Sequence, residues 1–528
     1  MSTPQSIINI CSGVRMDNRY EHSIYFADAS AQLGYFAGKV VKTFPAYSYL
    51  RKSWPLQVQA TMEEARKWNY LYFRNGTGKY YFYFINQIEY KNDNTVELTL
   101  ELDVIQTYLF DFELLECFVE RQHTTSDKLG EHTVDEGLEL GELVTTSSKD
   151  VSMSTMCILV MSSIDIGASI NEDDDEPVKM IGSYYDGIFG GTGIFAVEAS
   201  EWRALGNILL QLDNKGWSDS IISIWMYPKK LITLDTGSDW STVINKVASI
   251  KPFFEYVNRP TVLNGYAPKN NKLLMYPYCL LYATNNGNTG AVYQFERFGD
   301  PEECGFKILG ALTPEGSVRM YPLNYNGEQH AYDHGVTLGS FPTCAWNQDV
   351  YKLWLAQNQN QQQNTVNTAG LAIAGGAITA IASLYTGNVM GVVGGAGAVI
   401  GGAQQIGALL AQRKDMSIQP PQSKGQVSSS VNTVAGFQTF TLKTKTITKE
   451  MARILDDYFT CYGYKINRVQ KPNISARPAF TYVKTVGCHI KGDMCTEDIT
   501  KVESIFDKGI TFWKNGNKIA DYTQENNV

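Results

Sequence analysis

Alternating apolar and polar residues dominate this chain, and the clearest alternation lies in residues 94–104. In that stretch, NTVELTLELDV, every second side chain is apolar and acidic side chains or threonine fill most positions between, which predicts a half-buried strand. The stretch before it, KYYFYFINQIEY, is rich in aromatic residues and predicts another strand. Because residues 91–94, KNDN, favour a turn, we expect the two strands to form a long hairpin.

Helices are fewer than strands in this pattern. Thr61 followed by Glu64 has the form of a capping box, which predicts the start of a helix. Ser200 is placed to cap a helix in EWRALGNILLQL, and Gly216 would end that region. A third helix is expected from about Thr448, in ITKEMARILDDYFTCYGYK. The predicted fold class is therefore β-rich α+β, in several domains.

A long apolar segment interrupts the alternation. Between Leu353 and Gln412 the chain has no acidic residue, no basic residue and no histidine, and the centre of this window, Ala369–Ala411, is mostly glycine, alanine and aliphatic residues. Polar tracts flank it at Ala356–Thr368 and Ser417–Asn432, and both are too poor in apolar side chains to form a core. We therefore expect an insertion carried on flexible polar arms.

This segment has the length of a hairpin that crosses a membrane. As helices, Ala369–Leu384 and Val389–Ala411 would span about 24 and about 34 Å, whereas a bilayer core is about 30 Å thick. Tyr385–Asn388 would form the turn between them. The side chains expected to contact lipid are the larger ones of the two runs and the turn: Leu371, Ile373, Ile378, Ile381, Leu384, Tyr385, Val389, Met390, Val392, Val393, Val399, Ile400, Ile406, Leu409 and Leu410.

The composition of the segment differs from that of an ordinary membrane anchor. Each glycine costs about 1 kcal/mol of helix propensity relative to alanine, and small residues four positions apart let helices approach closely in lipid. These features favour a plastic segment that inserts as an assembly, and the alternative is a buried core hairpin. A resting state must cover the segment, because an exposed apolar patch of this size would aggregate.

Composition and charge limit the setting. The 528 residues are 44% hydrophobic and 19% charged, which is typical of a globular chain with several cores. The net charge of -9 disfavours a protein that grips nucleic acid through its phosphates, but not a surface past which DNA slides. The N-terminus lacks the regions of a cleavable signal peptide, and nine scattered cysteines suit a reducing compartment, so synthesis in a cytosol is expected.

Motifs that could carry chemistry are weak. Arg74–Tyr81, RNGTGKYY, lacks the upstream glycine, the hydroxyl residue and the helix of a phosphate loop, and it predicts a turn. Gly191–Ala196, GTGIFA, lacks the βαβ context of a dinucleotide site and predicts a loop. The acidic run Asn171–Glu176 lacks the ligand spacing of a calcium loop and predicts a solvated loop.

Metal binding and catalysis are also disfavoured. Cys488, His489 and Cys495 are soft ligands close in sequence, but no second pair stands at zinc-finger spacing. None of the six histidines lies in a nucleophile motif. A carboxylate pair that cleaves polysaccharide stays open, because any two of the 54 acidic residues could meet in space. We expect no enzymatic activity, no cofactor and no bound metal.

Motifs at both ends of the chain form a recognisable set. The N-terminal third contains SIYFADASAQLGYF, NYLYFRN, YYFYFINQIEY and ELDVIQTYLFDFELLECFVERQH, and the C-terminal part contains DDYFTCYGYKINRVQKPNISARPAFTYVKT and SIFDKGITFWKN. In this order they resemble the distal tail-tube, or tail-knob, proteins of small short-tailed bacteriophages of the Picovirinae type. The middle of the chain, about residues 125–355, shows little of this resemblance.

The resemblance implies a ring-like homohexameric tube at the tail tip, through which genome DNA and internal proteins leave the capsid. It also implies a long hydrophobic loop that plugs the lumen and is released to breach the host membrane. The implied partners are other phage tail proteins, the host bacterial membrane and double-stranded DNA in transit, and the implied location is the distal tail of a virion made in the host cytoplasm.

On this basis the chain is expected to divide into four parts. They are an N-terminal tail-tube part, residues 1–125; knob or middle domains, residues 126–345; polar arms with the hydrophobic loop, residues 346–425; and a C-terminal part that returns to the tube, residues 426–528.

A conduit for DNA must not bind it, so carboxylates or neutral groups are expected along the lumen. Glu97, Glu101 and Asp103 are expected on the polar face of one strand, which faces either the lumen or an outer surface. The leading functional hypothesis is a structural tail-tip tube protein with a deployable membrane-active loop. The alternatives are a receptor-binding or cell-wall-degrading tail protein and a stand-alone pore-forming protein.

Overall fold

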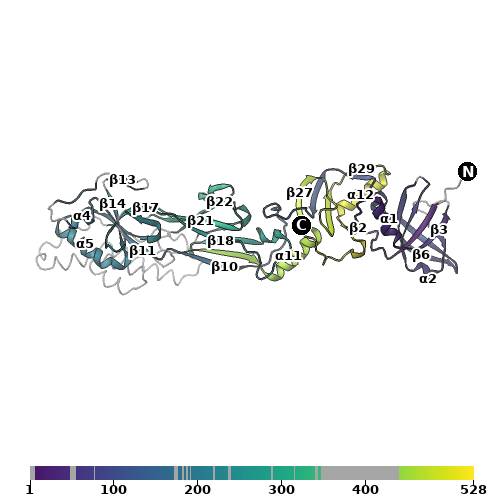
Figure 1. Ribbon diagram of the computed structural model, residues 1–528, viewed down its shortest axis with the longest axis horizontal. Coiled ribbons are helices and arrows are strands. Elements are labelled where there is room, and N and C mark those ends of the chain that lie inside the picture. The colour runs from purple at the N-terminus through teal and green to yellow at the C-terminus, as the bar shows by residue number, and fades with distance from the viewer. Residues whose placement is uncertain are drawn as a thin grey trace, which may run out of the picture. The chain divides into compact units, whose positions relative to one another are not determined.

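Two compact units make up the chain in the computed structural model (Figure 1). Unit 1 contains Met1–Leu143, Thr261–Tyr278 and Ile447–Val528, and unit 2 contains Val144–Pro260 and Cys279–Thr446. The structure describes residues 6–47, 55–76, 78–171, 176–180, 183–185, 188–190, 192–217, 220–235, 240–286, 289–313, 316–338, 343–345 and 439–527. Among the described residues strands outnumber helices in both units, so the predicted β-rich α+β class is confirmed.

The first sheet of unit 1 is antiparallel, with strand order β3-β1-β5-β6-β7-β4. Its strands are β1 (Ser6–Ser12), β3 (Val40–Tyr47), β4 (Leu56–Gln59), β5 (Trp68–Arg74), β6 (Tyr80–Asn92) and β7 (Thr95–Leu102). The predicted hairpin is confirmed as β6 and β7, with Tyr83 opposite Leu102 and Ile88 opposite Leu98. The alternate apolar side chains of β7 are buried as predicted, because this face lies against the core of unit 1.

The second sheet of unit 1 joins strands from the two ends of the chain, in the order β2-β30-β28-β9-β27. Its strands are β2 (His22–Ile24), β9 (Cys117–Gln122), β27 (Tyr464–Gln470), β28 (Phe480–Val486) and β30 (Ile510–Trp513). β2 is parallel to β30, and the other pairs are antiparallel. A separate pair joins β8 (Phe112–Leu114) to β29 (Ile490–Gly492), which again connects the two ends.

The helices of unit 1 begin at the residues that their caps select. They are α1 (Ala29–Ala37), α2 (Met62–Ala65), α3 (Val104–Tyr108), α11 (Lys449–Tyr462) and α12 (Thr496–Lys508). Thr61 accepts a hydrogen bond from the Glu64 amide and Thr448 accepts one from the Met451 amide. Both predicted starts are therefore confirmed, because a hydroxyl at each cap satisfies an amide that the first turn leaves unpaired.

Aromatic side chains fill the core of unit 1. The ring of Phe36, on α1, stacks on Tyr70 of β5 with 5.1 Å between centroids and lies 4.8 Å from Phe82 of β6. All three rings are buried, and the same pattern continues between the cross-strand partners Phe73 and Tyr81. Aromatic pairs of this kind contribute beyond the apolar area that they bury.

Unit 2 is built from three main sheets. A six-stranded sheet has the order β16-β17-β14-β11-β15-β25, a five-stranded one contains β18-β21-β22-β23 with β24 beside β22, and a four-stranded one has the order β10-β26-β19-β20. The strands of the first are β11 (Met156–Ser162), β14 (Gly193–Glu198), β15 (Ile221–Pro228), β16 (Ile232–Leu234), β17 (Asn245–Ile250) and β25 (Thr343–Ala345). Those of the second are β18 (Phe253–Asn258), β21 (Glu303–Gly310), β22 (Val318–Tyr325), β23 (Glu328–His330) and β24 (Val336–Leu338). Those of the third are β10 (Leu143–Ser152), β19 (Cys279–Thr284), β20 (Gly290–Tyr293) and β26 (Thr439–Ile447).

Two helices, α4 (Ile166–Asn171) and α5 (Trp202–Asn214), pack with the six-stranded sheet in one apolar core of unit 2. Leu205 and Leu209 of α5 are buried in it together with Ile158 of β11. β12 (Ser183–Tyr185) and β13 (Ile188–Gly190) form a separate two-stranded ribbon.

Two local predictions in unit 2 are wrong. Ser200 does not cap a helix, because Ala199–Glu201 forms a 3-10 turn and α5 begins at Trp202, while the Ser200 hydroxyl donates to Glu198 at 3.4 Å. Most of the expected GTGIFA loop belongs to β14, a strand buried between β11 and β17. The glycines suggested a loop, but Gly193 is the first residue of the strand and pairs with Ser162 of β11. Gly216, with φ +74°, follows α5 as expected.

A buried ion cluster ties three segments of unit 1 together. The Glu136 carboxylate, which is fully buried, contacts both the Arg121 guanidinium and the Lys272 ammonium and accepts a hydrogen bond from the Lys465 amide at 3.0 Å. Arg121 also donates to the Gly463 carbonyl at 2.7 Å, and Lys272 donates to the Val134 carbonyl at 2.8 Å. The cluster therefore joins the end of β9, the segment Thr261–Tyr278 and the start of β27.

We predict that Glu136→Gln lowers the free energy of unfolding of unit 1 by about 3 to 5 kcal/mol, because it leaves two buried cations without their anion. Chemical unfolding followed by tryptophan fluorescence would measure the loss. The double variant Glu136→Gln/Lys272→Met should lose less than the sum of its two single changes.

The matched control is Glu113→Gln, which breaks the exposed ion pair of Glu113 with Lys471. It should leave the unfolding midpoint nearly unchanged, because water screens this pair. Equal losses of unfolding free energy in Glu136→Gln and Glu113→Gln would contradict a special role for the buried cluster.

Candidate functional site

The acidic residues predicted on the strand face separate into two groups. Glu97 and Glu101 lie on the face of β7 that points away from the core. Glu97 accepts hydrogen bonds from Gln57 at 2.8 Å and from Lys91 at 3.0 Å, and these bonds hold its pKa below the ordinary value. Each carboxylate of this face is thus paired with a lysine, since Glu101 binds Lys501 at 2.8 Å.

Glu101 is held more firmly than Glu97. Partial burial raises its pKa, but hydrogen bonds from Asn18 at 2.7 Å, from Lys501 and from Asn86 at 2.8 Å outweigh burial, so the pKa lies below its ordinary value. The carboxylate is therefore ionised at neutral pH, and it connects β7 to helix α12, which carries Lys501.

Asp103 does not lie on this polar face, which corrects the sequence prediction. β7 ends at Leu102, and Asp103 is the N-cap of α3 and is 1% exposed. Its carboxylate accepts hydrogen bonds from the Gln106 amide at 3.1 Å and from the Tyr70 hydroxyl at 2.8 Å. Burial raises its pKa to about 6, so a buried cap in the core of unit 1 replaces the proposed lumen contact.

The predicted membrane-contacting residues, Leu371 to Leu410, lie outside the described residues, as do residues 346–438 as a whole. Within the part of the chain that the structure describes, no helix is long and apolar enough to cross a membrane. The two described elements that bound this segment are β25, which ends at Ala345, and β26, which begins at Thr439.

The cysteines singled out in the sequence have different surroundings. Cys488 is buried, and burial raises its pKa to about 12. Cys495 is exposed at the N-cap of α12, where its thiol donates to the Asp498 carboxylate at 3.1 Å. Among the described residues no three His, Cys, Asp or Glu side chains are grouped in a way that could hold a metal ion.

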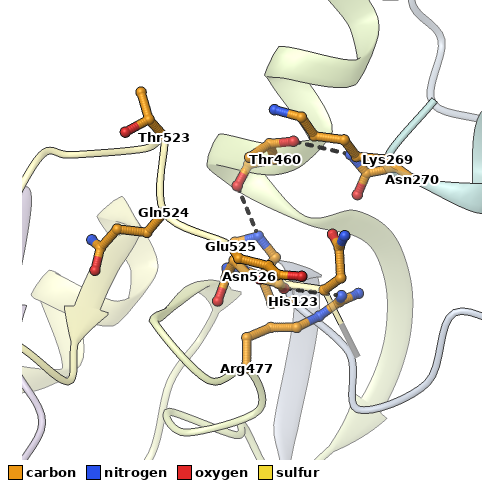
Figure 2. Close-up of a pocket in the computed structure, with 10 residues that line it drawn as sticks. His123, Lys269, Asn270, Thr460, Arg477, Thr523, Gln524, Glu525 and Asn526 are labelled. Carbon is orange, nitrogen blue, oxygen red and sulfur yellow. Dashed lines mark hydrogen bonds between the residues drawn. The ribbon is translucent and has the colours of Figure 1, made fainter. Parts of the chain in front are cut away.

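A pocket of about 210 Å³ in unit 1 is lined mostly by polar side chains (Figure 2). Its walls come from the residue after β9, from Lys269 and Asn270, from the last turns of α11, and from the C-terminal segment Thr523–Asn527. Lys269 and Thr523 are exposed at its rim, whereas His123 and Arg477 are buried in its wall. With Arg477, these residues come from five parts of the sequence.

His123 is neutral in this pocket. Its Nδ1 accepts a hydrogen bond from the Tyr482 amide at 2.8 Å, so its Nε2 carries the proton and donates to the Thr460 carbonyl at 3.1 Å (Figure 2). Burial, together with the nearby Arg477 guanidinium, lowers the pKa of His123 to about 3. Both ring nitrogens are used in structure, so His123 positions strands and α11 and is not placed as a general base.

Asp456 fixes the opposite wall. Its carboxylate accepts hydrogen bonds from the Lys269 amide at 2.8 Å, from the Asn270 amide at 3.0 Å and from the Tyr266 hydroxyl at 2.8 Å. The Asn270 side chain donates to this carboxylate at 2.7 Å and to the Thr460 hydroxyl at 3.0 Å. A buried carboxylate with several donors is satisfied, so this wall is rigid.

Sequence reasoning missed this pocket. His123 stands in one motif of the family resemblance, VERQH, and Arg477 in another, NISARPAF, but no spacing rule relates two residues so far apart. The remaining local signal was the placement of a histidine directly after a strand of mixed apolar and polar residues. Such a residue is more often a satisfied core group than a catalytic one, and the hydrogen bonds of His123 agree with that view.

We predict that His123 makes unit 1 less stable in acid. Its folded pKa of about 3 lies below the unfolded value of about 6.5, so as the pH falls the unfolded state binds the proton first. Stability is therefore lost between about pH 6.5 and pH 3, and this group alone should remove about 2 kcal/mol between pH 7 and pH 5.

Urea unfolding of the wild type and of His123→Gln at pH 7 and pH 5 measures this effect. The variant should be less stable at pH 7 but should lose less on acidification. His489→Gln is the matched control, because His489 is 73% exposed and lies outside this pocket. An equal acid loss in wild type and His123→Gln would contradict the prediction.

Comparisons with known proteins match the whole chain. The profile of the C-terminal domain of tail knob protein gp9 from Bacillus phage phi29 matches residues 239–527, and the profile of the caudoviral major tail protein N-terminus matches residues 4–113. Tail knob protein gp9 of Bacillus phage B103 is 26% identical, and the alignment covers 99% of this chain and 98% of that protein. Tail knob protein gp9 of Bacillus phage phi29 is 25% identical with the same coverage.

A solved structure agrees with these matches at the level of the fold. The tail knob protein gp12 of bacteriophage C1 superposes with a TM-score of 0.65 at 14% sequence identity, and 98% of each chain is covered. The matched relatives are structural tail knob proteins and not enzymes, which agrees with the expectation drawn from the motifs. The first profile spans more than half of the 528 residues, and the chain therefore belongs to the family of the phage tail knob protein gp9.

Proposed function

We propose that this protein is a structural subunit of the distal tail of a virion, where it forms a conduit for the ejected genome and carries a membrane-active loop. The observation that carries the proposal is the apolar segment Ala369–Ala411 within a chain that aligns over 99% of its length with tail knob proteins. The window from Leu353 to Gln412 has no charged side chain, so the segment can enter hydrocarbon without burying a charge.

The anchoring of this segment supports a loop that can be released. β25 pairs with β15, and β26 lies between β10 and β19 with most of its residues buried. Both strands are held by hydrogen bonds to other parts of unit 2. Deleting residues between them removes no described strand pair, so the loop and the fold of unit 2 can be tested separately.

The proposed conduit is a homohexameric ring, as the family resemblance implies, with other tail proteins as neighbours and double-stranded DNA passing without specific binding. Glu97 and Glu101 are the two proposed lining residues that stay after the correction of Asp103. Because each is paired with a lysine, the surface that they contribute is closer to neutral than to strongly acidic. A surface of this kind neither binds phosphates tightly nor adds a high barrier to sliding.

We expect the purified full-length protein to form a closed ring of defined stoichiometry, with six subunits. Light scattering should give a single oligomeric mass, and electron microscopy should show rings. A monomer at every concentration, without rings, would contradict the conduit.

Incubation of the rings with peptidoglycan or host surface polysaccharide should release no fragments. If fragments are released, and if substitution of one carboxylate abolishes that release, the result would favour a cell-wall-degrading function.

The membrane role predicts a sharp effect of charge. Val393→Asp places a carboxylate in the second apolar run and should cost about 3 kcal/mol per subunit at the bilayer centre, which abolishes insertion when it is repeated around a ring. Dye release from liposomes should fall to the level of a variant that lacks residues 369–411.

The matched control is Gln361→Asp, which adds the same charge in a polar arm and should leave dye release unchanged. All variants are first checked for intact rings and for their unfolding midpoints. Equal dye release from wild type, Val393→Asp and the deletion would refute the membrane role. Unfolding of unit 2 by Val393→Asp would instead favour a buried core hairpin.

A further inference from the structure

Arg477 is a buried cation whose charge is not balanced by a described carboxylate. Arg477 is 5% exposed, and its Nη1 donates one long hydrogen bond, of 3.3 Å, to the neutral carbonyl of Asn526. Its Nε has no hydrogen-bond partner among the described residues. Burying a guanidinium is costly unless an anion or several acceptors compensate for the lost water.

The contrast with Arg121 shows what is missing at Arg477. Arg121 is also buried in unit 1, but it contacts the Glu136 carboxylate and donates to the Gly463 carbonyl at 2.7 Å. Arg477 has only one weak acceptor in the same kind of environment. An arginine presents planar pairs of donors that fit carboxylate and phosphate groups, so the missing partner is expected to be an oxyanion.

Space for such a partner exists beside Arg477. The pocket that it lines has a volume of about 210 Å³, which exceeds the share of about 30 Å³ that one water molecule occupies in the liquid. The exposed rim at Lys269 and Thr523 gives access from solvent (Figure 2). The pocket can therefore admit an oxyanion attached to a small polar body.

The charges around the pocket favour an anion over a cation or a neutral molecule. Its charged lining residues are Arg477, Lys269 and Glu525, which give two positive charges against one negative charge while His123 is neutral. Glu525 is exposed, so water screens its charge, whereas the charge of Arg477 acts from a buried position. The buried Asp456 carboxylate behind the opposite wall is occupied by four hydrogen-bond donors, so the positive charge of Arg477 acts mainly on its own side of the pocket.

We propose that this pocket binds an oxyanion, a phosphate or a carboxylate carried on a small polar molecule, with Arg477 as its principal ligand. The bound group accepts from the part of the Arg477 side chain that lines the pocket. The C-terminal segment is joined to the backbone beside Arg477, because Asn526 accepts hydrogen bonds from the amides of Ala479 at 3.0 Å and Phe480 at 3.1 Å. Binding at Arg477 therefore also stabilises this segment. The site goes beyond the conduit and the membrane loop and depends on neither.

Calorimetric titration of the full-length protein tests the site with four probes at constant ionic strength: inorganic phosphate, glycerol 3-phosphate, acetate and glucuronate. We expect saturable binding of at least one probe with one site per subunit, and comparison of the two phosphates with the two carboxylates identifies the source of the oxyanion. Arg477→Met should weaken that binding at least tenfold. Arg453→Met, an exposed arginine on α11 outside the pocket, is the control and should bind as the wild type does.

A second pair of variants keeps the test valid if Arg477→Met does not fold. Asn527 is exposed at the pocket, so Asn527→Asp should fold and weaken binding by placing a negative charge near Arg477, whereas Asn527→Lys should strengthen it. Opposite shifts of the dissociation constant support the proposal. Absence of saturable binding for all four probes, or the same affinity in wild type and both Asn527 variants, overturns it.

Discussion

The pairing of β9 with both β27 and β28 is the constraint on which the rest of unit 1 depends. β9 follows the N-terminal sheet directly, but its two partners come from the other end of the chain, so that Arg121 and Gly463 meet across 342 positions. Both edges of β9 are satisfied only when the chain returns from unit 2. Such a long excursion is tolerated because the entropy of loop closure grows only with the logarithm of loop length.

Buried polar groups secure this return. Glu136 brings together Arg121 and Lys272, and Asp456 holds the Lys269–Asn270 backbone against α11. These groups fix the segment Thr261–Tyr278 within unit 1 although its sequence neighbours belong to unit 2. Arg477 differs from Glu136, Arg121, Lys272 and Asp456, because it has one long hydrogen bond and no described ion pair, and the proposed oxyanion site rests on that difference.

The apolar segment belongs to a different physical problem. Its two described neighbours, β25 and β26, are strands of unit 2, while Glu97, Glu101 and the pocket belong to unit 1. Conduit, pocket and membrane loop can therefore be altered independently by mutation. A membrane-active element needs a segment without charged side chains, whereas a DNA conduit needs a surface that interacts weakly with phosphates. The two proposed functions therefore place different demands on amino-acid composition, and separate segments of the chain can meet them.

The sequence by itself determined features that depend on near neighbours. Alternation identified the β6–β7 hairpin and its buried face, and the hydroxyls of Thr61 and Thr448 identified two helix starts, because strand periodicity and capping act over a few residues. The charge-free window and the family motifs are likewise identified from the amino-acid sequence alone.

Only the tertiary structure decided what distant partners control. Asp103 continued the alternation but is buried, because Tyr70, on another strand, supplies a hydrogen bond that lets it cap α3 in the core. The glycines of GTGIFA suggested a loop, but pairing with β11 and β17 makes most of that stretch a central strand. The pocket around His123 and Arg477 had no signal in the sequence, because its walls come from five separate segments whose proximity is set by folding and not by spacing along the chain.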